Sequence, residues 1–320
     1  SALFGFVNTI FKLLREESPD YLVAGFDGKK KTFRHDMYKD YKATREKMPD
    51  ELQQQLSHLW RIVEAMGIPR LQIDGFEADD IIGTLALDSA KAGLNCIILS
   101  GDKDFMQLVT DEILLQTPVK GGESIIYGPA EVKERWGVPP EKIIDLFGLM
   151  GDSSDNVPGV PGVGEKTAVK LIGEYGDFEN ILSHGKEVKN KRVREGLVNG
   201  IDLARLSREL VTIKTDINIP IEFEAMKVSK FNFKEMDELF RELEFYNLQN
   251  QLNDFRGDEN KKPLSVIKKE YSIIKTREDL NSMIEKLKGI DLISMDIEST
   301  SKDPMIADIV GFSFSIEANS

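Results

Sequence analysis

The chain has 320 residues, of which 41% are hydrophobic, and this length suits two or more domains with an ample core. Its net charge of -13 argues against a general nucleic-acid-binding surface, and its single cysteine excludes a disulfide framework and fits a reducing cytoplasm. No apolar run approaches the roughly 20 residues of a membrane span, and no signal peptide is visible. We therefore expect a cytoplasmic protein without a membrane partner.

The first part of the chain alternates helical and strand-like patterns. Apolar periodicity predicts helices over 1–16, 51–66 and 77–92, with a short helix from Asp102. Apolar runs bounded by turn residues predict strands over 21–26, 71–74, 95–100, 112–117 and 124–128. This alternation predicts an α/β fold with a largely parallel sheet.

From about residue 129 the pattern becomes mostly helical. Proline near the start and glycine at the end of successive segments match helix punctuation, and an extended stretch over 212–223 interrupts helices that run to about residue 250. The polar stretch 251–264 predicts a linker. Beyond it, 265–320 is typical of a strand, a helix and two strands, which begin another α/β domain.

Acidic clusters occur in similar settings at several places. They follow strand-like runs, open a helix or precede a glycine-rich turn, and comprise Asp27, Glu77, Asp79, Asp80, Asp102, Asp104, Asp152 and Asp155. Carboxylates at the ends of neighbouring parallel strands converge, and they repel one another unless cations lie between them. Hard divalent ions, above all Mg2+, fit such a site and support phosphodiester cleavage. Taken singly, Asp102 is also explained as a helix N-cap, and Glu77 and Asp79 as complements of a helix dipole. Asp152 and Asp155 are also explained as turn residues.

Residues 28–47, here called the basic segment, carry eight lysines and arginines against three acids. Phe33, Tyr38 and Tyr41 are interleaved with them. Basic side chains hold phosphates while aromatic rings stack on unpaired bases, so this pattern indicates a polyanionic substrate above the acidic site. A solvated lysine-rich loop is the alternative. We expect the basic segment to be mobile in the free protein because it is polar and has few core anchors.

The segment 159–176 contains a glycine-rich turn followed by a helix from Glu165, here called the glycine hairpin. Its glycines permit a tight turn, and the exposed N–H groups at the helix start form a site for a phosphate. Lys166 and Thr167 add a charge and a hydroxyl. A P-loop is excluded because Glu165, rather than glycine, precedes the lysine. The pattern resembles a helix-hairpin-helix motif, with a plain glycine-rich helix connection as the alternative.

Several motifs together resemble the 5'-nuclease domains of bacterial DNA polymerase I, within the flap endonuclease superfamily. The motifs are FDGKKKTFRH, YKATR, GFEADDIIGTLA, SGDKDFMQLV and GDSSDNVPGVPGVGEKTA, and the resemblance extends to about residue 250. It implies a PIN-like core over 1–135 with a twisted, mainly parallel sheet flanked by helices and a helical arch at about 28–50. It also implies a helical DNA-binding subdomain with a helix-hairpin-helix (helix-three-turn-helix) over 136–250.

The tail adds to this resemblance. MDIEST, with Asp296 and Glu298, is similar to the first metal motif of a 3'-5' exonuclease domain. Residues 265–320 would then be an incomplete RNase H-like α/β segment after the linker. Proofreading is not expected of this chain alone, because the remaining carboxylates of that domain would lie beyond Ser320.

The resemblance implies a role for each site residue. The nearer carboxylate shell would be Asp27, Glu77, Asp79 and Asp102. The metal site would be completed, partly through water, by Asp80, Asp104, Asp152 and Asp155. Lys42 and Arg45, with Tyr41 nearby, would lie in the arch and Arg34 in the same gateway. The duplex backbone would be held by Gly162, Val163, Gly164, Lys166 and Thr167. Two or more Mg2+ ions, with Mn2+ as a substitute, and K+ at the hairpin are the implied cofactors.

The activity implied by the resemblance is metal-dependent 5'-3' exonuclease and flap endonuclease cleavage. Its substrates would be 5' flaps and RNA primers on branched or nicked duplex DNA during replication and repair. Mg2+ would lower the pKa of a water that attacks the phosphorus, while Lys42 and Arg45 offset the charge of the transition state. We expect a monomer that is covalently continuous with polymerase domains.

One departure leaves alternatives open. Family members begin with a strand that carries a further metal-binding aspartate, and this strand would precede Ser1. We therefore expect the chain as it stands to be weakened or inactive as a nuclease, and a non-catalytic DNA-junction-binding module is one alternative. The other is a ribonuclease of the wider PIN-like superfamily, which would need neither the glycine hairpin nor the basic segment.

Overall fold

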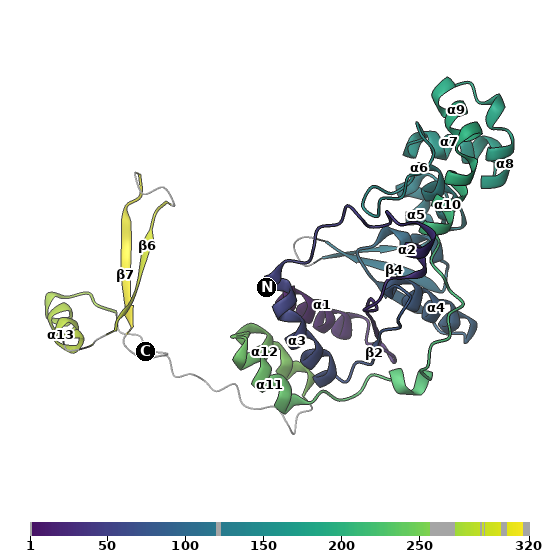
Figure 1. Cartoon of the computed structure of the whole chain (residues 1–320). Helices are drawn as coiled ribbons and strands as arrows, with labels where there is room; N and C mark the ends of the chain where they lie inside the picture. Colours follow the sequence, from purple (N-terminus) through teal and green to yellow (C-terminus); the bar gives the residue numbers. More distant parts are fainter. Residues whose placement is uncertain are drawn as a thin grey trace. The chain divides into compact units, whose positions relative to one another are not determined.

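Figure 1 shows the computed structural model of the chain, which describes residues 2–119, 123–256, 273–288, 290, 292–301 and 306–315. The chain forms two compact units, Ser1–Gln249 and Asn250–Ser320. None of the helices in these described ranges is long and apolar enough to cross a membrane.

The first part of the first unit has the element order that the sequence predicts. The elements are α1 (Ala2–Glu16), β1 (Ala24–Gly25), α2 (Phe33–Met37), α3 (Asp50–Ala65), β2 (Arg70–Leu71), α4 (Ala78–Lys91), β3 (Cys96–Leu99), the 3-10 helix η1 (Lys103–Leu108), β4 (Ile113–Pro118) and β5 (Ser124–Tyr127). The strands β1 and β2 are shorter than predicted. After Leu71 the chain turns, because the Phe76 N–H donates to the Ile73 carbonyl and Gly75 adopts a φ of 88°.

The described strands of this unit form two small sheets. β1 pairs with β2 in parallel, β3 pairs with β4 in parallel, and β5 adds to β4 in the antiparallel sense. The mainly parallel α/β fold is therefore confirmed. β1 lies close to α4, since a Cβ atom at Gly25 would come 2.8 Å from Ile82. Glycine at this position places the end of β1 beside the start of α4.

The second part of this unit is helical, as predicted. Its elements are α5 (Pro129–Trp136), η2 (Pro140–Lys142), α6 (Ile143–Met150), α7 (Glu165–Tyr175), α8 (Phe178–Ser183), η3 (Gly185–Glu187), α9 (Lys191–Asn199) and α10 (Ile201–Val211). One apolar core continues from the β3–β4 sheet into these helices through Phe105, Trp136 and Phe147. Gly148 lets α6 approach α10 closely, because a Cβ atom there would lie 2.9 Å from the Cα atom of Arg208.

The extended segment after α10 returns to the α/β part. The Gln107 side chain holds its start, donating to the Val211 carbonyl at 2.9 Å and accepting from the Ile213 N–H at 2.9 Å. Gly83 of α4 leaves room for Ile213 to pack. The chain then forms η4 (Phe223–Met226), α11 (Phe233–Glu242), α12 (Tyr246–Leu252) and η5 (Asn253–Phe255). α11 packs beside α3, and Phe240 meets Phe11 of α1 edge to face.

The basic segment is anchored more firmly than its composition suggests. The Arg34 guanidinium is 2% exposed and donates to both carboxylate oxygens of Asp80, each at 2.8 Å. It also donates to the carbonyls of Leu210 and Thr212 at 2.9 and 2.7 Å. Tyr41 is buried as well. The expectation that this segment has few core anchors is wrong. Arg34 lies in a run of cations that suggests an exposed surface, but it is buried and paired with the buried Asp80 carboxylate.

The second unit contains α13 (Arg277–Leu287) and an antiparallel hairpin of β6 (Ser294–Ser299) and β7 (Ile309–Ser315). Asp296 and Glu298 lie on the same face of β6 because side chains alternate along a strand. Most of the strand predicted before α13 and most of the predicted linker lie outside the described residues, and residues 273–275 form no strand. Residues 251–255, which the prediction gives to the linker, belong to α12 and η5.

Replacing Arg34 tests the anchor of the basic segment. We expect Arg34→Leu to lower the free energy of unfolding by about 3–5 kcal/mol, because the buried Asp80 carboxylate then lacks its counter-ion. Urea denaturation followed by circular dichroism measures the change. The matched control is Arg205→Leu, which removes a solvent-exposed ion pair with Glu179 and should change stability little. Equal stability of the two variants would contradict the anchoring role.

Candidate active site

The first acidic group lies at the start of α4. Glu77 is the N-cap residue, Asp79 lies in the first turn, and the Ala78 N–H donates to the Asp27 carboxylate at 2.9 Å. These acids complement the positive end of the helix, so the capping interpretation holds for each of them. The same geometry also gathers carboxylates from the end of β1 and from the start of α4 at one place.

The charge around Asp79 shows that further acids join this group. Burial raises the pKa of Asp79 to about 7, and the charges of Asp102, Glu77 and Asp27 add to the increase while Lys42 opposes it. Asp102 comes from the loop after β3, where its carboxylate accepts the Asp104 N–H at 2.9 Å. The structure therefore brings together acids that are distant in the sequence.

Asp104 connects this group to the pair after α6. Burial, followed by the charge of Asp102, raises the pKa of Asp104 well above its ordinary value, and Lys103 counteracts part of this effect. Asp152 and Asp155 raise the pKa of Asp104 further. One oxygen of Asp104 (Oδ1) is buried and has no hydrogen-bond partner within the described part of the chain. A buried carboxylate oxygen without a partner is costly unless a cation or water satisfies it.

The basic segment lies against these acids. Lys42 Nζ is 2.8 Å from Glu77 Oε1 and 3.7 Å from Asp155 Oδ2, and the Lys42 backbone N–H donates to the Asp155 carbonyl. The Tyr41 hydroxyl lies 3.2 Å from each of the same two carboxylates. Arg45 donates through Nε to Asp155 at 3.0 Å. Lys42 has a left-handed φ of 56°, so the backbone accepts strain where its side chain is placed between two acids.

Lys103 is a site residue that the sequence analysis did not single out. Its Nζ lies 2.7 Å from Asp152 Oδ2 and 5.3 Å from the centre of the Phe147 ring. Burial opposes ionisation of Asp152, but the hydrogen bond from Lys103 and that from the Ser154 N–H lower the pKa of Asp152 below its ordinary value. The available signal was the position of Lys103 between two aspartates in SGDKDF.

The carboxylates therefore divide into two classes. Glu77, Asp152 and Asp155 have lysine or arginine partners. Asp79, Asp102 and Asp104 have no such partner within ion-pair distance among the residues that the structure describes. In those same residues, no three acidic, histidine or cysteine side chains already surround one point. The unpartnered oxygen of Asp104 and the mutual repulsion of the second class fit a hard divalent cation with oxygen ligands.

Asp80 and Arg34 form a buried pair next to the acidic group, and Arg34 Nη1 also lies 3.6 Å from Glu77 Oε2. Besides Arg34, the Asp80 carboxylate accepts the Glu77 N–H at 3.1 Å and the Lys214 N–H at 2.9 Å. These bonds occupy both of its oxygens and bury it completely. The roles predicted for Asp80 in a metal site and for Arg34 in the gateway stay predictions, and both side chains are engaged with each other in this structure. The two residues join the basic segment to α4 and to the chain after α10.

The glycine hairpin has the predicted turn. Gly159 and Gly162 adopt left-handed φ values of 63° and 87°, and a Cβ atom at Gly159 would collide with the Gly151 nitrogen. Gly164 is the N-cap residue of α7, so no side chain caps the exposed N–H groups there. Lys166 is exposed and Thr167 is half-buried. The side chain of Val163 packs in the core and anchors the hairpin.

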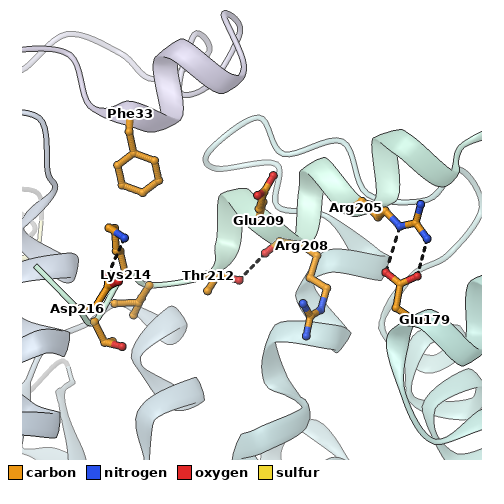
Figure 2. A pocket seen from close by; sticks show the side chains of 10 residues that line it. Phe33, Glu179, Arg205, Arg208, Glu209, Thr212, Lys214 and Asp216 are labelled. Carbon is orange, nitrogen blue, oxygen red and sulfur yellow. Dashed lines mark hydrogen bonds and ion pairs between the residues drawn. The ribbon is translucent and has the colours of Figure 1, made fainter.

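A recess of about 590 Å³ lies elsewhere on this unit, between Phe33 of α2, the helices α8 and α10, and residues 212–216 (Figure 2). Its cations are already neutralised. Arg205 forms two hydrogen bonds with Glu179, and Lys214 pairs with Asp216. The recess contains none of the predicted site residues, so it is not the candidate active site.

Comparison with known families places two adjacent matches on the first unit. Residues 1–137 match the 5'-3' exonuclease N-terminal resolvase-like domain, and residues 138–234 match the 5'-3' exonuclease C-terminal SAM fold. The DNA polymerase I of Bacillus subtilis is 42% identical over 255 residues, covering 79% of this chain and 29% of that protein. That of Pseudomonas aeruginosa is 38% identical over 327 residues, covering 99% of this chain and 36% of that protein.

Solved structures share the fold. T5 5'-exonuclease with bound divalent zinc ions has a TM-score of 0.59 and 21% identity, covering 79% of this chain and 89% of that one. The catalytic core of Rad2 in complex with DNA substrate has a TM-score of 0.52 and 18% identity, covering 79% and 85%. The chain spans less than two fifths of the polymerase relatives it matches.

The raised pKa of Asp79 predicts how stability depends on pH. Between the ordinary value of 3.8 and the folded value of about 7, the folded chain holds a proton that the unfolded chain releases. Stability should therefore fall as pH rises from 5 to 8 in EDTA, with Asp104 contributing in the same direction. Thermal melts across this range measure the effect.

Two comparisons make this test specific. Asp79→Asn should flatten the profile, whereas Asp88→Asn on the exposed face of the same helix should leave it unchanged. Mg2+ should raise the melting temperature more at pH 8 than at pH 5, because it binds the ionised acids. A wild-type profile that rises through this window would refute the assignment.

Proposed function

The chain belongs to the 5'-3' exonuclease family, and from this premise we propose that its first unit is a divalent-metal-dependent 5' nuclease that hydrolyses phosphodiester bonds in branched DNA. One observation carries the proposal. A set of half-buried, mutually repelling acids without cation partners lies beside Glu77 and Asp155, which Lys42 and Arg45 contact. Acids without counter-ions suit metal ions, and cations above them suit a phosphate.

Asp79, Asp102 and Asp104 are the residues proposed to hold the metal, with Asp27 beside them. Mg2+ is the proposed ion, because hard cations prefer carboxylate oxygens, and Mn2+ is a proposed substitute. When bound, such ions lower the pKa of a water and offset the negative charge of the phosphate. Glu77, Asp152 and Asp155 are proposed to act at a greater distance, because lysine and arginine already contact them.

Lys42 is proposed to steer the scissile phosphate. Its position is fixed twice, by the contact of its side chain with Glu77 and by the bond of its backbone N–H to Asp155. A charge held in place in this way stabilises the transition state without reorganising first. Arg45 is about half exposed, which suits a contact with the strand that enters the site. Tyr41 is buried beneath them and is proposed to set the spacing between Glu77 and Asp155.

The glycine hairpin is proposed to hold the duplex beside the site. The uncapped N–H groups at the start of α7 and the exposed Lys166 suit a backbone phosphate. A monovalent cation such as K+ is proposed to bind this turn. The whole protein is proposed to be a DNA polymerase I in which this unit removes 5' flaps and RNA primers, as a cytoplasmic monomer.

A second candidate is a DNA-junction-binding module without catalysis. One observation favours it, because no three potential metal ligands in the described ranges are already arranged around one point. The ribonuclease alternative has less support, since the chain contains both the glycine hairpin and the basic segment, and the basic segment contacts Glu77 and Asp155. The proposed 5' nuclease and the DNA-junction-binding module differ in whether the DNA is cleaved when Mg2+ is added.

Cleavage of a 5'-labelled double-flap DNA in Mg2+ tests the proposed function. We expect cuts at the base of the flap, and we expect both EDTA and Asp102→Ala to abolish them because each removes part of the metal site. Asp88→Ala, an exposed change on α4, serves as the control and should cut normally. Flap binding without any cut would support the module instead, and faster cleavage of structured RNA would support the ribonuclease.

Lys42→Ala tests the steering role. We expect the single-turnover cleavage rate to fall by about 100- to 1000-fold, since a preorganised charge acts mainly on the transition state. The Kd for the flap should change much less. Lys91→Ala, which removes an exposed lysine from α4, provides the control. A rate that stays within twofold of the wild type would exclude Lys42 from the chemistry.

A further inference from the structure

A second basic stretch lies in the helical part of the first unit. Residues 184–194 carry five lysines and arginines against one acid, Glu187, in a chain whose net charge is -13. The stretch follows α8 directly and comprises the short helix η3 and the start of α9. Its part from 185 to 192 is here called the α8–α9 loop. Neither the composition of the whole chain nor the motifs of the acidic site account for it.

The α8–α9 loop lies beside the glycine hairpin. α9 packs directly on the hairpin, because a Cβ atom at Gly196 would lie 2.5 Å from the Pro161 carbonyl oxygen. The side chain of Arg192 crosses Gly162, where an added Cβ atom would come 2.9 Å from Arg192 Cγ. The stem of Arg192 therefore covers the hairpin glycine, and the two loops meet on one surface.

The loop is held in one conformation. The Asn190 side chain caps α9 by accepting the N–H groups of Arg192 and Val193 at 3.0 and 3.3 Å. Arg194 turns inward and donates to the Val188 carbonyl at 2.7 Å. Gly185 is buried against Leu197. A ligand that binds this loop therefore meets cations whose backbone is already ordered, which lowers the entropic cost of binding.

The loop has four outward-facing cations, of which Lys191 pairs with Glu195 at 3.9 Å and the other three are not neutralised. Among the described residues, no carboxylate lies within ion-pair distance of Lys186, Lys189 or Arg192, and all three are exposed. The recess in Figure 2 differs, because its Arg205 and Lys214 are each paired with an acid. Uncompensated cations beside a turn that suits a phosphate are the pattern expected for a polyanion-binding surface.

We propose that the α8–α9 loop is a second phosphate-binding element, in which Lys189 and Arg192 contact the duplex backbone next to the phosphate held by the glycine hairpin. The inference rests on the proposed function, since it extends the same nucleic-acid surface. Two rigid loops that meet at Gly162 would bind neighbouring phosphates of one strand. The contact is independent of sequence, because phosphates carry no base information.

Binding of flap DNA in EDTA, measured by fluorescence anisotropy over a series of salt concentrations, tests this inference without requiring cleavage. The double variant K189M/R192M keeps the aliphatic stems and removes two charges. We expect its affinity to fall by about tenfold or more, equally for two unrelated DNA sequences. The slope of log affinity against log salt should decrease by about 2, since each lost phosphate contact contributes about 0.9.

The matched control is R205M/K214M, which removes two charges from the recess of Figure 2 and should leave the affinity and the slope unchanged. Circular dichroism melts check that both variants fold. Equal losses of affinity in the two variants, or no loss of affinity in K189M/R192M, would overturn the inference. If the wild-type chain still cleaves flap DNA in that case, the proposed function stands. A wild-type chain that neither binds nor cuts flap DNA would overturn both. Preferential binding of polyglutamate over duplex DNA would assign the loop to an acidic protein partner instead.

Discussion

Electrostatic repulsion among carboxylates is the constraint on which the rest of this structure depends. The fold brings acids from the end of β1, the start of α4, the loop after β3 and the loop after α6 into one another's field, and burial strengthens their repulsion. Such a group is stable only if opposite charge is supplied. The chain supplies part of it through Lys42, Arg45 and Lys103 and leaves the remaining acids without counter-ions.

The division between compensated and uncompensated acids connects the fold to its chemistry. The lysines that pair with Glu77 and Asp152 do not form ion pairs with Asp79, Asp102 or Asp104. A metal bound by these three acids would therefore stabilise the fold and complete the site together. The buried pair of Arg34 and Asp80 serves a different purpose. It connects the basic segment to α4 and to the end of α10, so Lys42 and Arg45 are held against the acids. Stability and positioning are therefore coupled through one ion pair.

The uneven distribution of charge reconciles an acidic chain with a nucleic-acid substrate. The lysines and arginines of the recess between α2, α8 and α10 are matched by acids. In the described part of the chain, no acid lies within ion-pair distance of Lys166 at the glycine hairpin or of Lys186, Lys189 and Arg192 in the α8–α9 loop. The negative net charge would then limit nucleic-acid binding to the few surfaces where unpaired lysines and arginines are exposed. Most of the acids lie in the α/β part, and the two proposed phosphate sites lie in the helical part, which also contributes Asp152 and Asp155.

Much of this protein is determined by its sequence alone, because local patterns specify helices, turns and the motifs that resemble a nuclease family. The order of elements, the acid-rich site and the glycine hairpin all follow from such patterns. The tertiary structure decided which charged residues pair with one another. Arg34 and Asp80 are buried partners next to Glu77, Val163 is a core residue, and Lys103 pairs with Asp152. Ion pairs between residues distant in sequence depend on packing, which no local pattern records.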